Sequence, residues 1–448
     1  MKKIILFILI IISAMLNYAQ GTWERTSNFP GGQQRVFALT TTHNNSIIAE
    51  SRGTGIYRST NNGINWTLVS SAEKYLAALY TAPNGTIYAL NTVSYASVDI
   101  ARSTDDGLTW NRVYSRSTPD NFYAEGGIIS LPNGHLVASL ERIVGQFVSD
   151  ASSLALRSTD SGASWTVVWD DSAVNRGTLK DFHLLDNKIF ASYSTGLGLV
   201  CPVVYSSDEG FSWLSPATSF TAFGNSLTVD ASGNLYAGTY GAENVTEKLF
   251  VSSDLGVTWQ NGGLPGGSIY TVFVASNGDM YAASDYSNSP YAPKVRRSTN
   301  HGQSWGLLLD GMPLSLRTYA FTENAAGDIF AGTDISLTNI PGGVFILRNI
   351  IGIHSVSEEI PARYSLSQNY PNPFNPSTNI GFRIVDFGLV RLTIFDVTGK
   401  EISILVNNEL KPGNYEVNWN GENYPSGVYF YKLETGKFTE TKKMILIK

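Results

Sequence analysis

A phrase of nine residues returns six times along this chain, and its spacing restricts the possible folds more than any other feature. The third copy, Arg157–Trp165, reads Arg-Ser-Thr-Asp-Ser-Gly-Ala-Ser-Trp, and every other copy also ends on tryptophan with glycine three positions earlier. Successive tryptophans are separated by 44 to 55 residues. Repeats of this length are typical of stacked structural units or of a β-propeller.

Each repeat also contains a turn between two short apolar runs, upstream of the nine-residue phrase. Asn84-Gly85 and Asn277-Gly278 are examples, and Asn-Gly is the strongest short signal for a β-hairpin because both residues tolerate positive φ. We therefore predict four antiparallel strands per repeat, two around this turn and two around the phrase. Helical and leucine-rich repeats would need periodicities that are absent from the sequence.

The repeats predict an all-β fold, with a seven-bladed β-propeller over residues 20–350. Six blades contain the phrase, whereas the seventh has strands near Asp328–Asp334 and Gly343–Arg348 and no tryptophan after them. The segment that begins Thr22-Trp23 looks like the missing outer strand. We predict that it completes the seventh blade, which would close the ring and remove its free edges.

The two ends of the chain predict export. Lys2 and Lys3 precede an apolar run from Ile4 to Leu16, which is typical of a secretory signal peptide over residues 1–19. No later run is long enough for a membrane span. The single cysteine excludes an intramolecular disulfide framework. The net charge of −6 comes from an excess of acidic residues in 20–350, which argues against nucleic acid as a partner.

The composition changes after Arg348. Residues 351–362 read as a linker, and residues 363–448 as a small immunoglobulin-like β-sandwich with turn signals every 10–15 residues. Its expected strands are Ile380–Ile384, Val390–Asp396, Gly413–Trp419, Gly427–Leu433 and Lys443–Ile447.

Four ordered motifs in this second region carry a family resemblance. They are Tyr370–Phe374, Ile394–Lys400, Ser426–Leu433 and Lys442–Lys448. Together they resemble the C-terminal sorting domain of the Por, or type IX, secretion system. The resemblance implies recognition by that machinery and export through the periplasm, with the mature protein secreted or held at the cell surface.

The nine-residue phrases resemble the Asp-box, or bacterial neuraminidase repeat, Ser-x-Asp-x-Gly-x-Thr-Trp. The resemblance implies a structural role for Ser59, Asn61, Gly63, Trp66, Asp105, Gly107, Trp110, Asp160, Gly162, Trp165, Asp208, Gly210, Trp213, Asp254, Gly256, Trp259, Asn300, Gly302 and Trp305. Asn61 and Asn300 stand where the pattern has aspartate. We expect each tryptophan to be buried between strands.

A ligand is expected on the face opposite these turns, at the loops that join the second and third strands of each blade. The binding candidates there are Glu50, Arg52, Tyr95, Arg142, Tyr240, Tyr286 and Tyr291. Tyrosines beside charged groups suit sugars, because the rings stack on apolar sugar faces and the acids accept hydroxyl bonds. The alternative interpretation is that these are ordinary solvated loop residues.

Two functions remain open from the sequence. Asp-box propellers include non-enzymatic binding platforms, similar to sortilin-type receptors and photosystem II assembly factors, and we favour a secreted binding module for a glycan or protein. The alternative is a sialidase-like or xyloglucanase-like glycoside hydrolase using carboxylates among Glu141, Glu243, Asp285 and Asp334. Asn28-Phe29-Pro30 lacks the Arg-Ile of the sialidase motif. Five scattered histidines show no ligand spacing, so we predict no metal. We also expect no cofactor and a monomer.

Overall fold

The computed structural model describes residues 22–26, 29, 35–73, 75–93, 97–117, 121–122, 126–143, 151–170, 177–195, 202–216, 223–240, 249–264, 267–286, 289–308, 311–313, 316–334, 340–348, 354–357, 361–410, 412–421 and 424–448. The predicted signal peptide, residues 1–19, lies outside them. Contacts divide the described chain into an N-terminal unit, Thr22–Leu347, and a C-terminal unit from Arg348 to Lys448. The described residues form no helix, and hence none that could cross a membrane.

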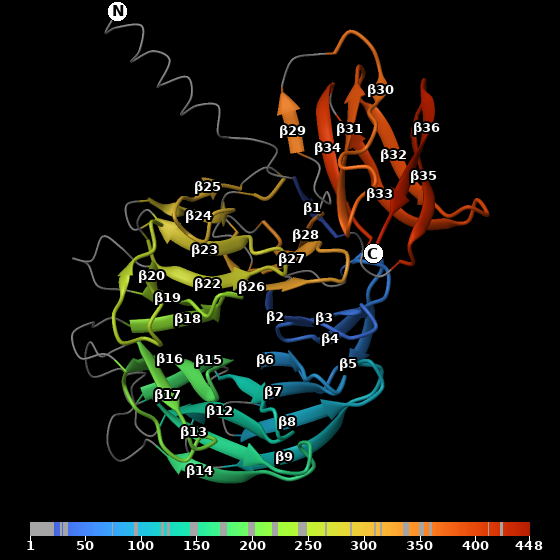
Figure 1. The fold of residues 1–448 in the computed structure, drawn as a ribbon. Helices are drawn as coiled ribbons and strands as arrows, with labels where there is room; N and C mark the ends of the chain where they lie inside the picture. The colour runs from blue at the N-terminus through green and yellow to red at the C-terminus, as the bar shows by residue number, and fades with distance from the viewer. Residues whose placement is uncertain are drawn as a thin grey trace, which may run out of the picture. The chain divides into compact units, whose positions relative to one another are not determined.

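The described strands of the N-terminal unit form seven antiparallel sheets, which follow one another along the chain (Figure 1). The first contains β2 (Val36–Thr41), β3 (Ile47–Ser51), β4 (Gly55–Ser59) and β5 (Thr67–Ser70), and the second β6 (Leu76–Thr81), β7 (Ile87–Val93), β8 (Ser97–Ser103) and β9 (Asn111–Ser117). The third contains β11 (Ile128–Ser130), β12 (Leu136–Ile143), β13 (Ala151–Ser158) and β14 (Thr166–Asp170), with β10 (Asn121–Phe122) also paired to β12. The fourth contains β15 (Gly177–Leu185), β16 (Lys188–Thr195) and β17 (Val203–Ser206).

The remaining three sheets have four strands each. The fifth contains β18 (Phe223–Val229), β19 (Leu235–Tyr240), β20 (Leu249–Ser252) and β21 (Gln260–Asn261), and the sixth β22 (Ile269–Val274), β23 (Met280–Tyr286), β24 (Ser289–Ser298) and β25 (Gly306–Leu307). The seventh contains β26 (Thr318–Glu323), β27 (Ile329–Thr333), β28 (Gly343–Leu347) and β1 (Trp23–Arg25). The innermost strand of each sheet contacts the innermost strands of its two neighbours, and β26 contacts β2, so these strands form a closed circle.

The N-terminal strand pairs where the sequence predicted. β1 runs antiparallel to β28, with Trp23 opposite Leu347 and Arg25 opposite Phe345. Trp23 is only 1% exposed and packs in one apolar cluster with Phe321 and Phe345. The hydroxyl of Thr26 donates a further bond of 2.9 Å to the carbonyl oxygen of Val344. The first and last described strands of this unit therefore belong to one sheet.

Each of the six repeated phrases forms a turn with the same pattern of hydrogen bonds. In the third copy, Ser158 Oγ accepts a bond from the Gly162 amide (2.8 Å) and donates to Asp160 Oδ1 (2.8 Å). The other bonds to Asp160 come from the amide (2.9 Å) and hydroxyl (2.6 Å) of Ser164. The same serine and aspartate or asparagine contacts recur in the other five copies. These side-chain oxygens are thus engaged within the turns.

The fifth residue of the turn connects neighbouring sheets. Asp106, in the second turn, binds Arg58 and Ser46 of the first sheet. Glu209, in the fourth turn, accepts bonds from Arg157 Nε (2.6 Å) and Asn133 (2.7 Å) of the third sheet. The same position in the first turn, Asn62, contacts the seventh sheet, where the side chain of Asn324 donates to it at 3.2 Å.

The tryptophans of the turns are less buried than expected. Only Trp66 is buried, at 8% exposed, whereas Trp110, Trp165, Trp213, Trp259 and Trp305 are half-buried. Each of these five rings packs against an apolar cluster but keeps part of its surface exposed, so the expectation of full burial was wrong for them. Several rings lie back over their own turn, as where Trp259 Nε1 donates to the Gly256 carbonyl at 2.9 Å.

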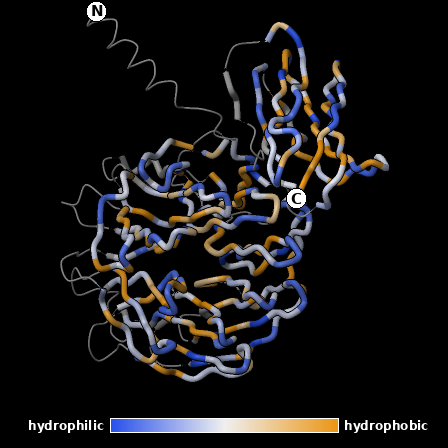
Figure 2. Tube along the Cα trace, viewed as in Figure 1, coloured by the Kyte–Doolittle hydropathy of each residue, from blue (hydrophilic) through white to orange (hydrophobic). Residues whose placement is uncertain are grey.

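The C-terminal unit consists of two four-stranded antiparallel sheets. One has the order β29 (His354–Ser357), β34 (Gly413–Asn420), β31 (Ser377–Ile384) and β30 (Ser365–Leu366). The other has the order β33 (Glu401–Leu410), β32 (Gly388–Phe395), β35 (Gly427–Thr435) and β36 (Thr439–Leu446). Alternate residues of both sheets meet in one core that includes Phe382, Trp419, Leu392, Tyr431 and Met444. Figure 2 shows apolar stretches in the strands of both units, interrupted by hydrophilic turns.

Candidate functional site

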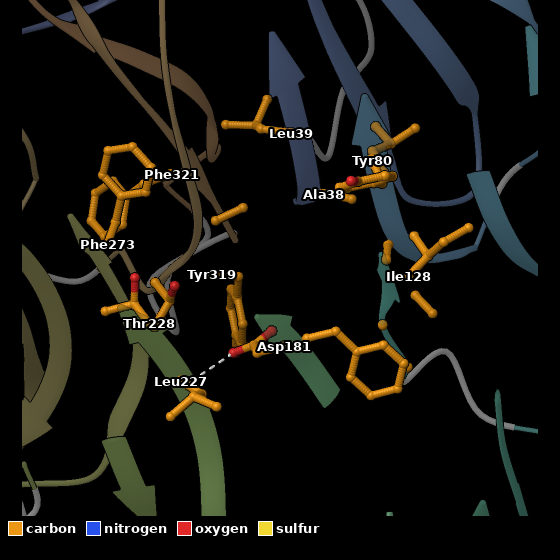
Figure 3. Close-up of a pocket in the computed structure, with 18 of the residues that line it drawn as sticks. Ala38, Leu39, Tyr80, Ile128, Asp181, Leu227, Thr228, Phe273, Tyr319 and Phe321 are labelled. Carbon is orange, nitrogen blue, oxygen red and sulfur yellow. Dashed lines mark hydrogen bonds between the residues drawn. The ribbon is translucent and has the colours of Figure 1, made fainter. Parts of the chain in front are cut away.

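One cavity of about 350 Å³ is lined by residues from the innermost strand of every sheet in the N-terminal unit (Figure 3). Space for it comes from small residues, notably Ala38, Ala78, Gly126 and Gly127. A Cβ on Gly126 would lie 2.2 Å from the carbonyl oxygen of Ser139, so only glycine fits there. Aromatic rings and a few polar groups cover the rest of the wall, a composition typical of ligand sites.

The innermost strands share an irregularity that determines which side chains face this cavity. Pairing shifts by a residue near the start of β2, β6, β18, β22 and β26, and in the middle of β15. In β22 and β26 the extra residues are Tyr270 and Tyr319, and in β2 Phe37 lies in the shifted segment. A β-bulge bends the strand and redirects a side chain, and bulges are frequent beside active sites.

Three of these rings form a continuous row, which we call the aromatic row: Phe37, Tyr319 and Tyr270. The centroid distances are 4.5 Å between Phe37 and Tyr319 and 5.3 Å between Tyr319 and Tyr270. An arginine stacks at each end, with Arg52 Cζ 4.7 Å from the Phe37 centroid and Arg317 Cζ 5.5 Å from that of Tyr270. All three rings are half-buried, and Phe37 and Tyr319 line the cavity.

Asp181, which is labelled in Figure 3, and His183 bring ionisable groups to the cavity wall. Asp181 has a φ of 45°, and its Oδ2 accepts a bond from the Leu227 amide at 3.1 Å. Burial raises the pKa of Asp181, although His183 and Lys180 oppose the shift. Burial also lowers the pKa of His183. Both shifts favour neutral forms, which suit hydrogen bonding to a polar ligand.

The predicted residues Glu50, Arg52 and Asp334 lie close to the junction of the first and seventh sheets. The Arg52 amide donates to the Arg35 carbonyl at 2.8 Å, and Arg35 Nε forms an ion pair with Asp334 Oδ1 at 3.1 Å. Glu50 is the second-last residue of β3 and is only 1% exposed. Burial raises its pKa to about 8, against the opposing charge of Arg52.

The other predicted residues do not form a described cluster with these. Glu141 is a buried residue of β12 in the third sheet. Tyr95 and Glu243 lie outside the described residues. The backbones of Arg142, Tyr240, Asp285, Tyr286 and Tyr291 lie in β12, β19, β23 and β24, but their side chains are outside the described part. Among the described residues, no group of three His, Cys, Asp or Glu side chains could hold a metal.

Sequence reasoning missed the aromatic row, Asp181 and His183 because it searched the loops and not the innermost strands. One signal was available. Phe37, Tyr270 and Tyr319 each occupy the second position of the first strand in their repeat. Aligning the repeats on the strand starts would have placed three aromatic rings at equivalent positions.

Residues 368–448 match the family described as "Secretion system C-terminal sorting domain". No curated protein matches the sequence. The C-terminal region is therefore a sorting domain of the Por type, which indicates type IX export to the cell surface or the medium.

Solved structures with a similar fold include YCF48 from Cyanidioschyzon merolae, at 12% identity and a TM-score of 0.51, covering 73% of this chain and 98% of that one. A structure of YCF48 bound to D1 peptide has 13% identity and a TM-score of 0.50, covering 74% and 95% of the two chains. The extracellular domain of the putative one-component system BT4673 from B. thetaiotaomicron has 10% identity and a TM-score of 0.50, covering 96% and 60%. These likenesses define the fold of the N-terminal unit as a β-propeller.

Proposed function

We propose that this protein is an exported seven-bladed Asp-box propeller that binds a glycan at the aromatic row and the adjoining cavity. Its C-terminal immunoglobulin-like domain, residues 363–448, would direct export after removal of residues 1–19, and the propeller would occupy residues 20–350. The segment 351–362, predicted as a linker, contributes β29 to the C-terminal unit. The observation that carries the binding role is a cavity walled by the innermost strands of all seven described sheets, with half-buried rings on its wall.

The chemistry of the wall supports a sugar ligand. Half-buried aromatic faces stack on the apolar faces of sugar rings, while Asp181, Thr228 and Thr271 line the same cavity and offer hydrogen-bonding groups. A peptide is the alternative ligand, because the similarly folded YCF48 has been solved with a D1 peptide. Only the similarity in fold to YCF48 favours a peptide ligand. The aromatic and polar residues that line the cavity of this chain favour a sugar.

Binding to a glycan array would test the proposal. The Tyr319→Ala variant should lose most binding, because it removes the central ring of the row. Leu108→Ala is the matched control, since Leu108 is an exposed apolar residue of a repeated turn, 53% exposed. Equal binding by both variants, or binding to peptides and to no glycan, would contradict the proposal.

A glycoside hydrolase is the second candidate, because Asp181 is a carboxyl group with a raised pKa on the cavity wall. Such enzymes need two carboxyl groups, and Asp181 is the only carboxylate among the described lining residues. Incubation with polysaccharides should therefore release no new reducing ends. Turnover that is abolished in Asp181→Asn, with binding retained, would instead establish the hydrolase.

A further inference from the structure

Arg52 combines a fixed backbone with a guanidinium that has no polar partner among the described residues. Its amide is held by the Arg35 carbonyl at 2.8 Å, and the following turn is closed by Thr54, which bonds to the Ser51 carbonyl through its amide (2.9 Å) and hydroxyl (2.8 Å). The guanidinium lies over Phe37, at 4.7 Å, and near Tyr75, at 5.9 Å from that ring's centroid. Within the described part it forms no ion pair and no side-chain hydrogen bond.

Stacking leaves the edge of this guanidinium available. An arginine held by its planar face keeps its N–H donors directed outward in a fork, which matches the two oxygens of a carboxylate. Arg35, by comparison, is already paired with Asp334. Arg52 is half-buried and Tyr75 is 40% exposed, so the position is open to a ligand.

The nearby acid does not neutralise this arginine at neutral pH. Glu50 is buried, and burial raises its pKa to about 8 against the opposing charge of Arg52 and the backbone amides of Phe37 and Leu76. At pH 7 it is mostly protonated. The positive charge of Arg52 is therefore not offset by Glu50, although the protein as a whole carries a net charge of −6.

We propose that Arg52 binds a carboxylate of an acidic polysaccharide whose sugar rings lie along the aromatic row. The inference rests on the proposed glycan-binding function and specifies its ligand class as uronate-like sugars. The row supports a polymer because Tyr319 and Tyr270 continue from Phe37 and each ring is half-buried, so their exposed parts extend the aromatic surface beyond the carboxylate position. An acidic protein has no general attraction for anions, so a preference for acidic sugars must arise locally.

Calorimetric titration of the full mature chain with oligogalacturonate, its methyl ester and a neutral xyloglucan oligosaccharide would test this inference. We expect the acid to bind best, and Arg52→Gln to weaken it by about tenfold to a hundredfold, as for loss of a charge-assisted hydrogen bond. Arg52→Lys should recover part of the affinity, because it restores the charge without the fork. Binding of the acid should also weaken with added salt.

Arg102→Gln is the matched control, because Arg102 belongs to a repeated turn, where it donates to the Ser161 carbonyl at 2.9 Å. It should bind as the wild type does. Equal affinity for the acid and its ester, unaffected by Arg52→Gln, would overturn the carboxylate site while leaving glycan binding intact. If polyglutamate binds as well as oligogalacturonate, the ligand is an acidic peptide. If no sugar binds at all, the proposed function itself fails.

Discussion

Two adjacent residues in each repeated turn have positive φ, and they differ in what they tolerate. The fifth residue has a φ of 55° to 62°, and it is Asn, Asp, Ser, Glu, Leu or His in the six copies. The sixth residue is always glycine, with φ between 75° and 92°. A Cβ at this glycine would collide with the preceding sheet in several copies, for example 2.5 Å from Tyr88 at Gly162. Close approach between sheets, as well as backbone conformation, thus explains the invariance of glycine along this chain.

Gly162→Ala should destabilise the N-terminal unit by roughly 2–4 kcal/mol, because it adds both backbone strain and a clash. Gly134→Ala separates the two effects. Gly134 has a similar φ of 81°, but a Cβ there would meet nothing within 4 Å, so only the backbone cost of about 1 kcal/mol is expected. Chemical denaturation would measure both variants, and equal losses would show that packing at the turn is unimportant.

The raised pKa of Glu50 predicts that the free energy of unfolding falls as pH rises. The folded protein keeps the Glu50 proton up to about pH 8, whereas the unfolded chain releases it near the ordinary value of 4.5. Stability from this group is therefore highest below pH 4.5, is lost between about 4.5 and 8, and stays low above that range. Glu50→Gln mimics the protonated form and should raise the free energy of unfolding at pH 8 by roughly 2–4 kcal/mol.

Thermal unfolding at pH 4.5 and pH 8 would measure this effect. The Glu50→Gln variant should be more stable than the wild type at pH 8 and about as stable at pH 4.5. Glu24→Gln, an exposed residue of β1, controls for the loss of a surface charge. An equal gain at both pH values would refute the explanation by burial.

At the scale of elements, the closing strand β1 should be more important for stability than the tryptophan of any half-buried turn. Trp23→Ala empties a site that is 1% exposed and should cost about 3–5 kcal/mol. Trp165 is half-buried, so Trp165→Ala should cost less, about 1–2 kcal/mol. Urea denaturation of the two variants would compare them, and a larger loss for Trp165 would contradict the assignment of β1 as the closing strand.

The strands that sequence reasoning located are those with regular alternation or a strong turn beside them. It found the Trp23 segment by counting outer strands, and this pairing is confirmed. It missed β33 (Glu401–Leu410), whose pairing with β32 shifts register twice and so breaks the two-residue period. Among the residues that the structure describes, the fourth sheet has a single bridge, Tyr205 with Leu214, in place of an outer strand, and Pro216 follows two residues later.

The candidate site was harder to predict because it depends on bulges and on contacts between distant repeats. A bulge is not visible in the hydrophobic pattern, yet it sets the direction of Tyr270 and Tyr319. The ion pair between Arg35 and Asp334 and the ring contact between Phe37 and Tyr319 both cross from the first sheet to the seventh. Only closure of the circle of strands brings these residues together.

At the scale of the whole molecule, the two units should separate folding from export. The N-terminal unit has its own apolar clusters, as does the C-terminal one. Deleting residues 364–448 should therefore leave a folded propeller in the periplasm, since the sorting domain is gone. Cell fractionation, with circular dichroism of the retained protein, would test this. Normal amounts of the truncated protein outside the cell would contradict the role of the tail.

The pairing of β1 with β28 also determines how the N-terminal unit responds to a pulling force. Trp23 begins one strand and lies opposite Leu347, which ends the other, so the chain enters and leaves this unit at neighbouring positions. A force applied to both ends would load the hydrogen bonds between β1 and β28 one at a time, as in peeling, rather than sharing the load among them. The seam that completes the circle is therefore also where the unit would open first under tension.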